Sequence, residues 1–196
     1  MKILKRILIV FAILLMVVAV IGLMLPSHVH VERSTTISRP QEMVFDYVNN
    51  IQNWNSWSPW YELDTTASYT LSGPPSGLGA KINWVSTNKN VGTGSMTYTE
   101  VTTPSKIVQD LNFMEEGVAT GTYSFVADGE GTKVTWSFEF DTGFNPLLRI
   151  MGKFIDGMVG KDFEKGLSNL KSILENMPIP QAEQQSEVQA PDSVPV

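Results

Sequence analysis

Residues 132–176 read TKVTWSFEFDTGFNPLLRIMGKFIDGMVGKDFEKGLSNLKSILEN. Within 132–141 apolar and polar side chains alternate, which is the period of a strand with one buried face. Asn145 and Pro146 form a helix start signal, because an Asn side chain caps the first turn and proline fits the first helical position. An apolar face then recurs at helical spacing as far as Asn176. The stretch therefore predicts one strand that runs into one long helix.

Four glycines interrupt this helical pattern: Gly152, Gly157, Gly160 and Gly166. Each glycine costs about 1 kcal/mol relative to alanine in the interior of a helix. An unbroken helix is therefore not expected. We predict a kink or break between Gly157 and Gly160, with a longer regular helix after it.

Upstream of this stretch the chain holds further strand signals. Val29, Val31 and Ile37 lie on one face of an alternating segment, and five later segments are rich in β-branched and aromatic residues. Ser38 caps a short helix after the first segment, and a second short helix is expected within 51–60. One strand, two short helices, six strands and a long helix predict an α+β fold. The five later segments are 67–71, 80–85, 94–101, 106–113 and 118–126.

Short motifs follow one another along the chain in a characteristic order. They are Val31-Glu32-Arg33, Pro40 with Val44-Phe45, the tryptophan-rich WNSWSPW of 54–60, Gly77-Leu78-Gly79-Ala80, Gly92-Thr93-Gly94, Gly131-Thr132 with Val134-Thr135-Trp136, and Phe163-Glu164-Lys165-Gly166-Leu167 with Asn169-Leu170-Lys171. Through these motifs the chain resembles, over about residues 29–175, the SRPBCC superfamily, the START and polyketide-cyclase-like group. The resemblance implies the helix-grip fold, in which a seven-stranded antiparallel curved sheet grips the C-terminal helix.

The resemblance also implies a ligand-sized apolar cavity, and the alternation of the strands indicates which side chains would line it. Aromatic and Met side chains give large, adaptable apolar contact, and tyrosine hydroxyls can orient a polar group. Arg33 has the same parity as Val29 and Val31, so it is the one polar candidate, since an inward Arg needs an anionic partner or ligand. The alternative is a filled core without space. The predicted lining residues are Ile82, Trp84, Met96, Tyr98, Leu111, Phe113, Tyr123, Phe125, Trp136, Phe138, Met151, Ile155, Met158 and Arg33.

The N-terminal run 7–25 is uncharged and almost entirely apolar. As a helix with a rise of about 1.5 Å per residue, it is long enough to cross a hydrocarbon core of roughly 30 Å. Lys2, Lys5 and Arg6 precede the run, so the positive-inside bias puts residues 1–6 in the cytoplasm. We predict a single-pass anchor in the cytoplasmic membrane, with the domain on the extracytoplasmic side; a cleaved signal peptide is the alternative.

Composition bounds the remainder of the chain. Residues 29–176 suffice for one domain with its own core, whereas 177–196 is rich in Pro, Gln, Glu and Ser and is predicted to be disordered. The chain has 20 Asp and Glu against 14 Lys and Arg, and its net charge of -6 argues against nucleic acid as a partner. The sequence contains no cysteine, which excludes disulfides and a thiol nucleophile.

Catalytic and metal motifs find little support in the sequence. It holds no Gly-x-Ser-x-Gly, His-Glu-x-x-His or phosphate-loop pattern. His28 and His30 share one face of a strand, but the sequence indicates no third ligand, so neither a metal nor another cofactor is predicted. Trp54, Trp57 and Trp60 are interpreted as structural cover at one end of the sheet rather than as a sugar or headgroup site.

The leading functional prediction is a noncatalytic, membrane-anchored domain that binds a lipid or another hydrophobic small molecule. Only residues 26–28 separate the anchor from the first strand, a reach of roughly 10 Å, so the domain is expected to sit against the bilayer surface. One alternative is an enzyme similar to the polyketide cyclases and dehydratases of the family, acting in the apolar cavity. The other is a scaffold that binds a protein partner through the tryptophan loop or the tail.

Overall fold

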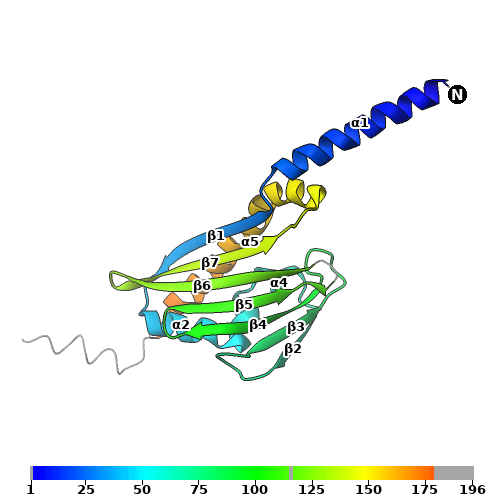
Figure 1. Ribbon diagram of the computed structural model, residues 1–196. Helices are drawn as coiled ribbons and strands as arrows, with labels where there is room; N and C mark the ends of the chain where they lie inside the picture. Colours follow the sequence, from blue (N-terminus) through cyan, green and yellow to red (C-terminus); the bar gives the residue numbers. More distant parts are fainter. Residues whose placement is uncertain (1, 115–116, 179–196) are drawn as a thin grey trace, which may run out of the picture.

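A computed structural model describes residues 2–114 and 117–178 of the chain. α1 (Lys2–Met24) extends away from a domain in which a curved antiparallel sheet packs against α5 (Pro146–Asn176) (Figure 1). The predicted α+β helix-grip arrangement is confirmed, with seven strands, short helices after the first strand and a long C-terminal helix. The disordered tail predicted for 177–196 lies, except for its first two residues, outside the described residues.

The seven strands pair in the order β1-β7-β6-β5-β4-β3-β2, and all pairs are antiparallel. The alternating sequences form this sheet because one face of the strands is buried and the other meets water. From β2 to β7 neighbours in the chain are also neighbours in the sheet, whereas β1 pairs with the last strand, where Val31 lies opposite Phe138. The strands are β1 (His28–Ile37), β2 (Ser68–Ser72), β3 (Lys81–Val85), β4 (Thr93–Thr102), β5 (Lys106–Asn112), β6 (Val118–Asp128) and β7 (Gly131–Asp141).

The single short helix predicted within 51–60 is divided into three pieces. Ser58 has an extended backbone (φ -63°, ψ 124°) and ends one piece, because the ring of Pro59 disfavours a helical conformation in the residue before it. Pro59 itself takes the first position of the next piece, where its missing N–H is not needed. The helices between β1 and β2 are α2 (Gln41–Asn49), η1 (Ile51–Asn53), α3 (Trp54–Trp57) and α4 (Pro59–Leu63).

A kink or break was predicted between Gly157 and Gly160. α5 is continuous through its whole length, so the break is wrong, whereas the kink stays a prediction. Two of its glycines serve close packing instead. A Cβ on Gly160 would overlap the guanidinium of Arg33, and one on Gly166 would come within 2.9 Å of the Trp136 ring. The low helix propensity of these glycines is therefore offset by the close approach of α5 to the sheet.

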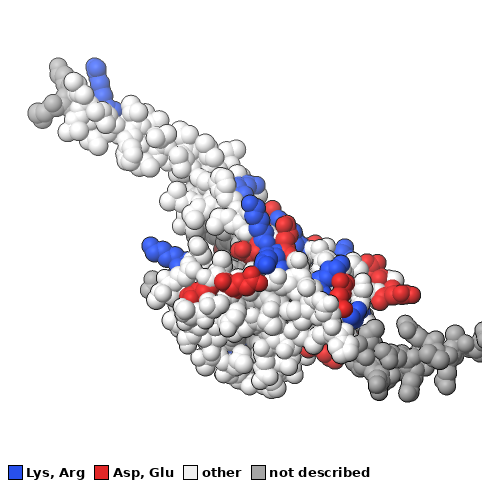
Figure 2. Space-filling view, turned by 180° about the vertical axis from the view of Figure 1, so that it is seen from behind, with Lys and Arg blue, Asp and Glu red and all other residues white. Residues whose placement is uncertain are grey.

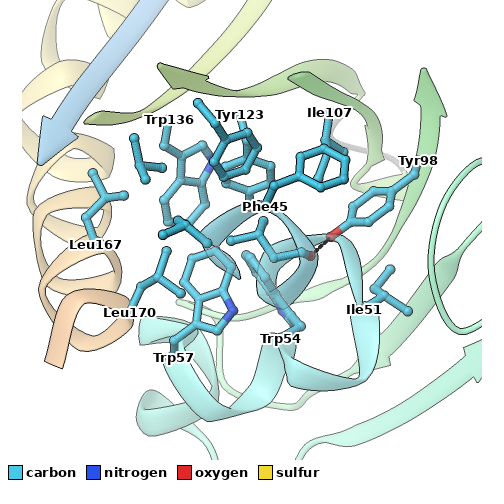
Figure 3. Close-up of a cluster of buried hydrophobic side chains, with 14 of the residues drawn as sticks. Phe45, Ile51, Trp54, Trp57, Tyr98, Ile107, Tyr123, Trp136, Leu167 and Leu170 are labelled. Atoms are coloured by element: carbon cyan, nitrogen blue, oxygen red, sulfur yellow. Dashed lines mark hydrogen bonds between the residues drawn. The ribbon is translucent and has the colours of Figure 1, made fainter. Parts of the chain in front are cut away.

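Aromatic side chains pack between the sheet, α3 and α5 (Figure 3). The ring of Trp136 in β7 stacks on Phe163 of α5 at a centroid distance of 4.0 Å. Trp57 of α3 meets Trp136 edge-on at 5.4 Å, and Trp57 is only 1% exposed. Aromatic pairs in these geometries are favourable beyond the area that they bury. This core fixes the C-terminal half of α5 to the sheet.

The end of α1 is fixed to the beginning of α5. A Cβ on Gly22 would come within 2.5 Å of the Pro146 carbonyl oxygen, so the two helices touch at this point. The Arg149 guanidinium donates hydrogen bonds to the carbonyl oxygens of Leu23 and Leu25 at 2.8 and 3.1 Å. These bonds satisfy acceptors that the end of a helix leaves without an intrahelical partner. α1 is therefore held to the domain by contacts as well as by the linker.

Candidate functional site

An apolar cavity of about 210 Å³ lies between the sheet, α3, α4 and the middle of α5. An apolar cavity of about 150 Å³ is large enough to hold benzene, so this space suits a small hydrophobic molecule. Aromatic side chains dominate its walls, which is typical of ligand sites. The walls consist of Trp54, Trp60, Tyr69, Trp84, Met96, Gln109, Leu111, Phe113, Trp136, Phe138, Val159 and Phe163, together with residues 89–93.

Six of the predicted lining residues face this cavity. They come from β3, β4, β7 and the end of β5, where the period of two places every second side chain on the concave face of the sheet. Their role as contacts to a ligand stays a proposal. The six are Trp84, Met96, Leu111, Phe113, Trp136 and Phe138.

Four other predicted lining residues belong to the closed core, and each is at most 1% exposed. Short helices cover this part of the sheet, where the Tyr98 hydroxyl donates a hydrogen bond to the Val48 carbonyl oxygen of α2 at 2.8 Å (Figure 3). Burial raises the pKa of Tyr98 above its usual range. These side chains therefore have the predicted inward direction but are not part of the cavity wall. The four are Ile82, Tyr98, Tyr123 and Phe125.

Three predicted lining residues lie on α5 outside the cavity. Met151 and Met158 are 58% and 67% exposed, and Ile155 is partly buried against the core. On α5 the cavity is lined by Val159 and Phe163 instead. The prediction treated the whole apolar pattern of the helix as one face, whereas only part of that pattern packs on the domain.

Arg33 also lies outside the cavity. Its guanidinium pairs with two carboxylates of α5, at 2.8 Å from Asp156 and 2.8 Å from Glu164, and its side chain is 26% exposed. Hydrogen bonds from Arg33 hold the pKa of Asp156 below its usual range. An inward Arg needed an anionic partner, and α5 supplies that partner because it packs over β1.

Gln109 is a polar residue of the cavity that the sequence analysis did not single out. It is 1% exposed, its Nε2 lies 3.4 Å from the Tyr123 hydroxyl oxygen, and its Oε1 has no partner among the described residues. A buried polar atom without a partner costs about 1–3 kcal/mol, so a donor on a bound molecule would stabilise it. The sequence could have indicated this inward position, because Gln109 alternates in step with the inward residues Ile107 and Leu111 of β5.

Tyr69 is a second polar side chain in the cavity wall. Its hydroxyl is buried and has no partner within the part of the chain that the structure describes. Burial raises the pKa of Tyr69 above its usual range, with smaller contributions from Asp64 and Tyr61. As part of the cavity wall, Tyr69 therefore offers a hydroxyl that can donate a hydrogen bond.

The loop between β3 and β4 forms one edge of the cavity. Trp84 Nε1 donates a hydrogen bond across this loop to the Val91 carbonyl oxygen at 3.2 Å. The Ser86 hydroxyl donates to the Asp64 carboxylate at 2.5 Å, and this bond is the main cause that lowers the pKa of Asp64. Lys89 is exposed at the tip. The loop is thus tied to the end of α4 and presents a cation at the rim.

His28, His30 and Glu139 form a polar cluster on the outer face of β1 and β7. Their potential ligand atoms lie within 4.8 Å of one another, and His30 Nδ1 is 2.8 Å from Glu139 Oε1. Strand pairing brings this third side chain into place, because His30 lies opposite Glu139 in the register. Hydrogen bonding between imidazole and carboxylate accounts for the arrangement. The predicted absence of a metal stays a prediction.

Comparisons with known proteins agree with this architecture. Residues 28–175 match the protein family described as polyketide cyclase / dehydrase and lipid transport. No curated protein matches the chain.

Several solved structures share the fold. The Zhui aromatase/cyclase from a Streptomyces species is 15% identical, with a TM-score of 0.58 over 76% of this chain and 94% of that one. A protein of unknown function from Staphylococcus aureus is 15% identical, with a TM-score of 0.57 over 81% and 97% of the two chains. A protein from Chromobacterium violaceum is 13% identical, with a TM-score of 0.55 over 76% and 99%. At these identities the likeness shows the fold alone.

Proposed function

The chain belongs to the polyketide cyclase / dehydrase and lipid transport family, and from this membership we propose that it is a membrane-anchored domain that binds a lipid or another hydrophobic small molecule. The observation that carries the proposal is the aromatic cavity of about 210 Å³, in which the Gln109 carboxamide oxygen has no partner among the described residues. Apolar walls with a few placed polar groups are typical of sites for small apolar molecules.

The polar groups of the cavity support binding rather than a reaction. The Gln109 carboxamide is not titratable near neutral pH, so it orients a bound molecule through hydrogen bonds. Burial raises the pKa of Tyr69 further above neutral pH. A cyclase-like or dehydratase-like reaction, the alternative, needs a group that moves a proton at the bound molecule. Within the described lining, such a reaction would use Tyr69, a half-buried side chain whose hydroxyl is buried.

The chemistry of the walls indicates the class of ligand. Flat aromatic faces such as those of Trp84, Trp136 and Phe138 offer apolar contact to a hydrocarbon chain or a ring system. Gln109 Oε1 can accept a hydrogen bond from a bound molecule and the Tyr69 hydroxyl can donate one, because neither atom has a partner among the described residues. We propose a mostly apolar ligand that carries a hydroxyl or amine group for Gln109 and an oxygen acceptor for Tyr69.

α1 supports a location at the membrane. The helical segment Ile3–Met24 is long and apolar enough to cross a bilayer, and its side chains are mostly exposed. Figure 2 shows an uncharged surface along α1, with basic charge near its N-terminal end. By the positive-inside bias, we propose that this end is cytoplasmic and that the domain lies on the extracytoplasmic side.

A probe titration tests the proposed binding site. The full chain is reconstituted in lipid nanodiscs, and the fluorescence of added 1-aminoanthracene is measured after subtraction of the signal from empty nanodiscs. Val159→Trp fills part of the cavity, whereas Val126→Trp adds the same side chain at a position of β6 that is 59% exposed. We expect binding to weaken about tenfold or more for Val159→Trp alone. Equal binding by the two variants, both shown to be folded by circular dichroism, would contradict the proposal.

A further inference from the structure

The edge of the cavity that the β3–β4 loop forms, which we take as its mouth, lies at the same end of the sheet as α1. β1 begins where β7 ends, with His28 opposite Asp141, and α1 joins the domain there. Because the strands alternate in direction, β3 ends, β4 begins and β5 ends at this same end. The cavity-lining residues Trp84, Thr93 and Phe113 come from these strand ends. Figure 1 shows the three strand ends on the side of the sheet from which α1 departs.

The first half of α5 and the loop before it expose large apolar side chains. We define the apolar row as Phe144, Leu147, Met151, Phe154 and Met158, whose exposed fractions lie between 58% and 88%. Spacings of three and four residues place these side chains on one side of the helix. A contiguous exposed apolar surface is typical of a site that contacts a membrane or a partner.

The apolar row stops where the same side of α5 reaches α4. The next positions on the same side of the helix are Asp162, Lys165 and Asn169. Lys165 pairs with the Glu62 carboxylate of α4 at 3.4 Å, and Asn169 donates a hydrogen bond to the same carboxylate at 2.8 Å. On this side of α5 the exposed apolar side chains are therefore confined to the half that adjoins α1, while other sides of the same half pack on β1 and on the core.

The bilayer is the occupant that the structure favours for the apolar row. Arg149 binds the carbonyl oxygen of Leu23, so the row begins beside the end of α1. If α1 spans the membrane, the first half of α5 starts at the membrane surface. Residues 144–158 contain two basic side chains, Arg149 and Lys153, and one acidic side chain, Asp156, which is paired with Arg33. An apolar side with nearby basic residues is typical of a helix that lies in the interface among anionic headgroups.

We propose that the apolar row lies in the membrane interface and that the cavity mouth opens toward the bilayer, so that a membrane-resident hydrophobic ligand enters the cavity without crossing water. Met151, Ile155 and Val159 follow one another at intervals of one helical turn and connect the row to the cavity wall. Met114 and Val118, 55% and 73% exposed, add further exposed apolar side chains at the end of β5 and the start of β6. This inference rests on the proposed anchoring by α1 and on the proposed ligand site.

Single-cysteine labelling tests the inference, because the chain has no cysteine of its own. The full chain is reconstituted in vesicles of phosphatidylcholine and phosphatidylglycerol with a bimane label at one introduced cysteine. Met151→Cys and Phe154→Cys report on the row, Leu14→Cys in α1 reports on the bilayer, and Val126→Cys, at an exposed position on the far half of β6, reports on water. Nitroxide groups on the lipid acyl chains then quench the labels that lie in the membrane.

Labels in α1, in the apolar row and on the far half of β6 together distinguish failure of the inference from failure of the anchoring. We expect strong quenching at positions 14, 151 and 154 and several-fold weaker quenching at position 126. If positions 151 and 154 are quenched no more than position 126 while position 14 is quenched, the inference is overturned and the anchor and the ligand site stand. If position 14 is not quenched either, the anchoring on which the inference rests is overturned as well.

Discussion

The indole ring of Trp136 and the phenyl ring of Phe163 stack with their planes 8° apart and their centroids 4.0 Å apart. The pair joins β7 to the middle of α5, and both rings line the cavity. The same contact therefore holds the helix on the sheet and forms one wall of the proposed ligand site. Beyond this contact toward the N-terminus of α5 lies the apolar row.

Truncation of the stacked ring should destabilise the domain. Phe163→Ala removes a side chain that is 1% exposed and leaves a space in the core, so we expect a loss of about 3–5 kcal/mol in the free energy of unfolding. Urea denaturation of the full chain in detergent measures this loss. Phe154→Ala, at a position that is 67% exposed, is the matched control and should change stability by less than about 0.5 kcal/mol. Equal effects of the two variants would show that the stack does not hold α5.

Replacing two glycines of α5 by alanine should change the free energy of unfolding in opposite directions. Gly157 has open space around it, so Gly157→Ala should raise the free energy of unfolding by up to about 1 kcal/mol through helix propensity. Gly166→Ala places a Cβ within 2.9 Å of the Trp136 ring and should lower it by about 1–3 kcal/mol. Thermal unfolding of the two variants in parallel gives the comparison. The reverse order would mean that α5 does not lie as close to β7 as the structure shows.

The ion pair between Arg33 and Asp156 should make the domain sensitive to acid. Hydrogen bonds from Arg33 lower the pKa of Asp156 in the folded state below the value of 3.8 that applies without them. The pair therefore stabilises the fold fully above that pH, and this stabilisation is lost as the pH falls through the lowered folded pKa. Asp156→Asn should flatten the decline in stability below about pH 4, as measured by urea denaturation at a series of pH values. Parallel profiles for the variant and the natural chain would contradict this account.

The carboxamide in the cavity should select for a polar group on the ligand. Binding of 1-naphthol, which has a hydroxyl donor, is compared with binding of naphthalene, which has none. A hydrogen bond to Gln109 contributes about 1 kcal/mol, so Gln109→Leu should reduce the preference for 1-naphthol about fivefold. Gln52→Leu, at an exposed position of η1, is the matched control and should leave the preference unchanged. An unchanged preference in Gln109→Leu would exclude this residue from recognition.

Strand alternation predicted the sheet and the side chains that point inward from it. It did not predict which of these inward side chains meet the cavity. It found Trp84 and Phe138, because parity determines which face of a sheet a side chain takes. It also selected Tyr98 and Tyr123, which have the inward direction but lie where α2 and α3 close the space. Whether an inward side chain meets the cavity or the closed core depends on which helices cover that part of the strand. This is decided by tertiary structure and cannot be read from the strand itself.

Other features depended on contacts between distant segments. The glycines of α5 suggested a break because propensity acts locally, whereas Gly166 is needed for the approach of Trp136 from β7. His28 and His30 gained Glu139 only through the pairing of the first and last strands. The inward position of Gln109 could have been predicted from the alternation of β5. A polar residue at an inward strand position is an exception, and such exceptions are candidates for a functional role.

Native mass spectrometry of the full chain, released from detergent micelles, tests most directly whether the cavity holds a hydrophobic molecule. We expect a discrete added mass on the natural chain and on Val126→Trp, and its loss from Val159→Trp. A folded natural chain without any added mass, or an added mass that persists on Val159→Trp, would contradict it.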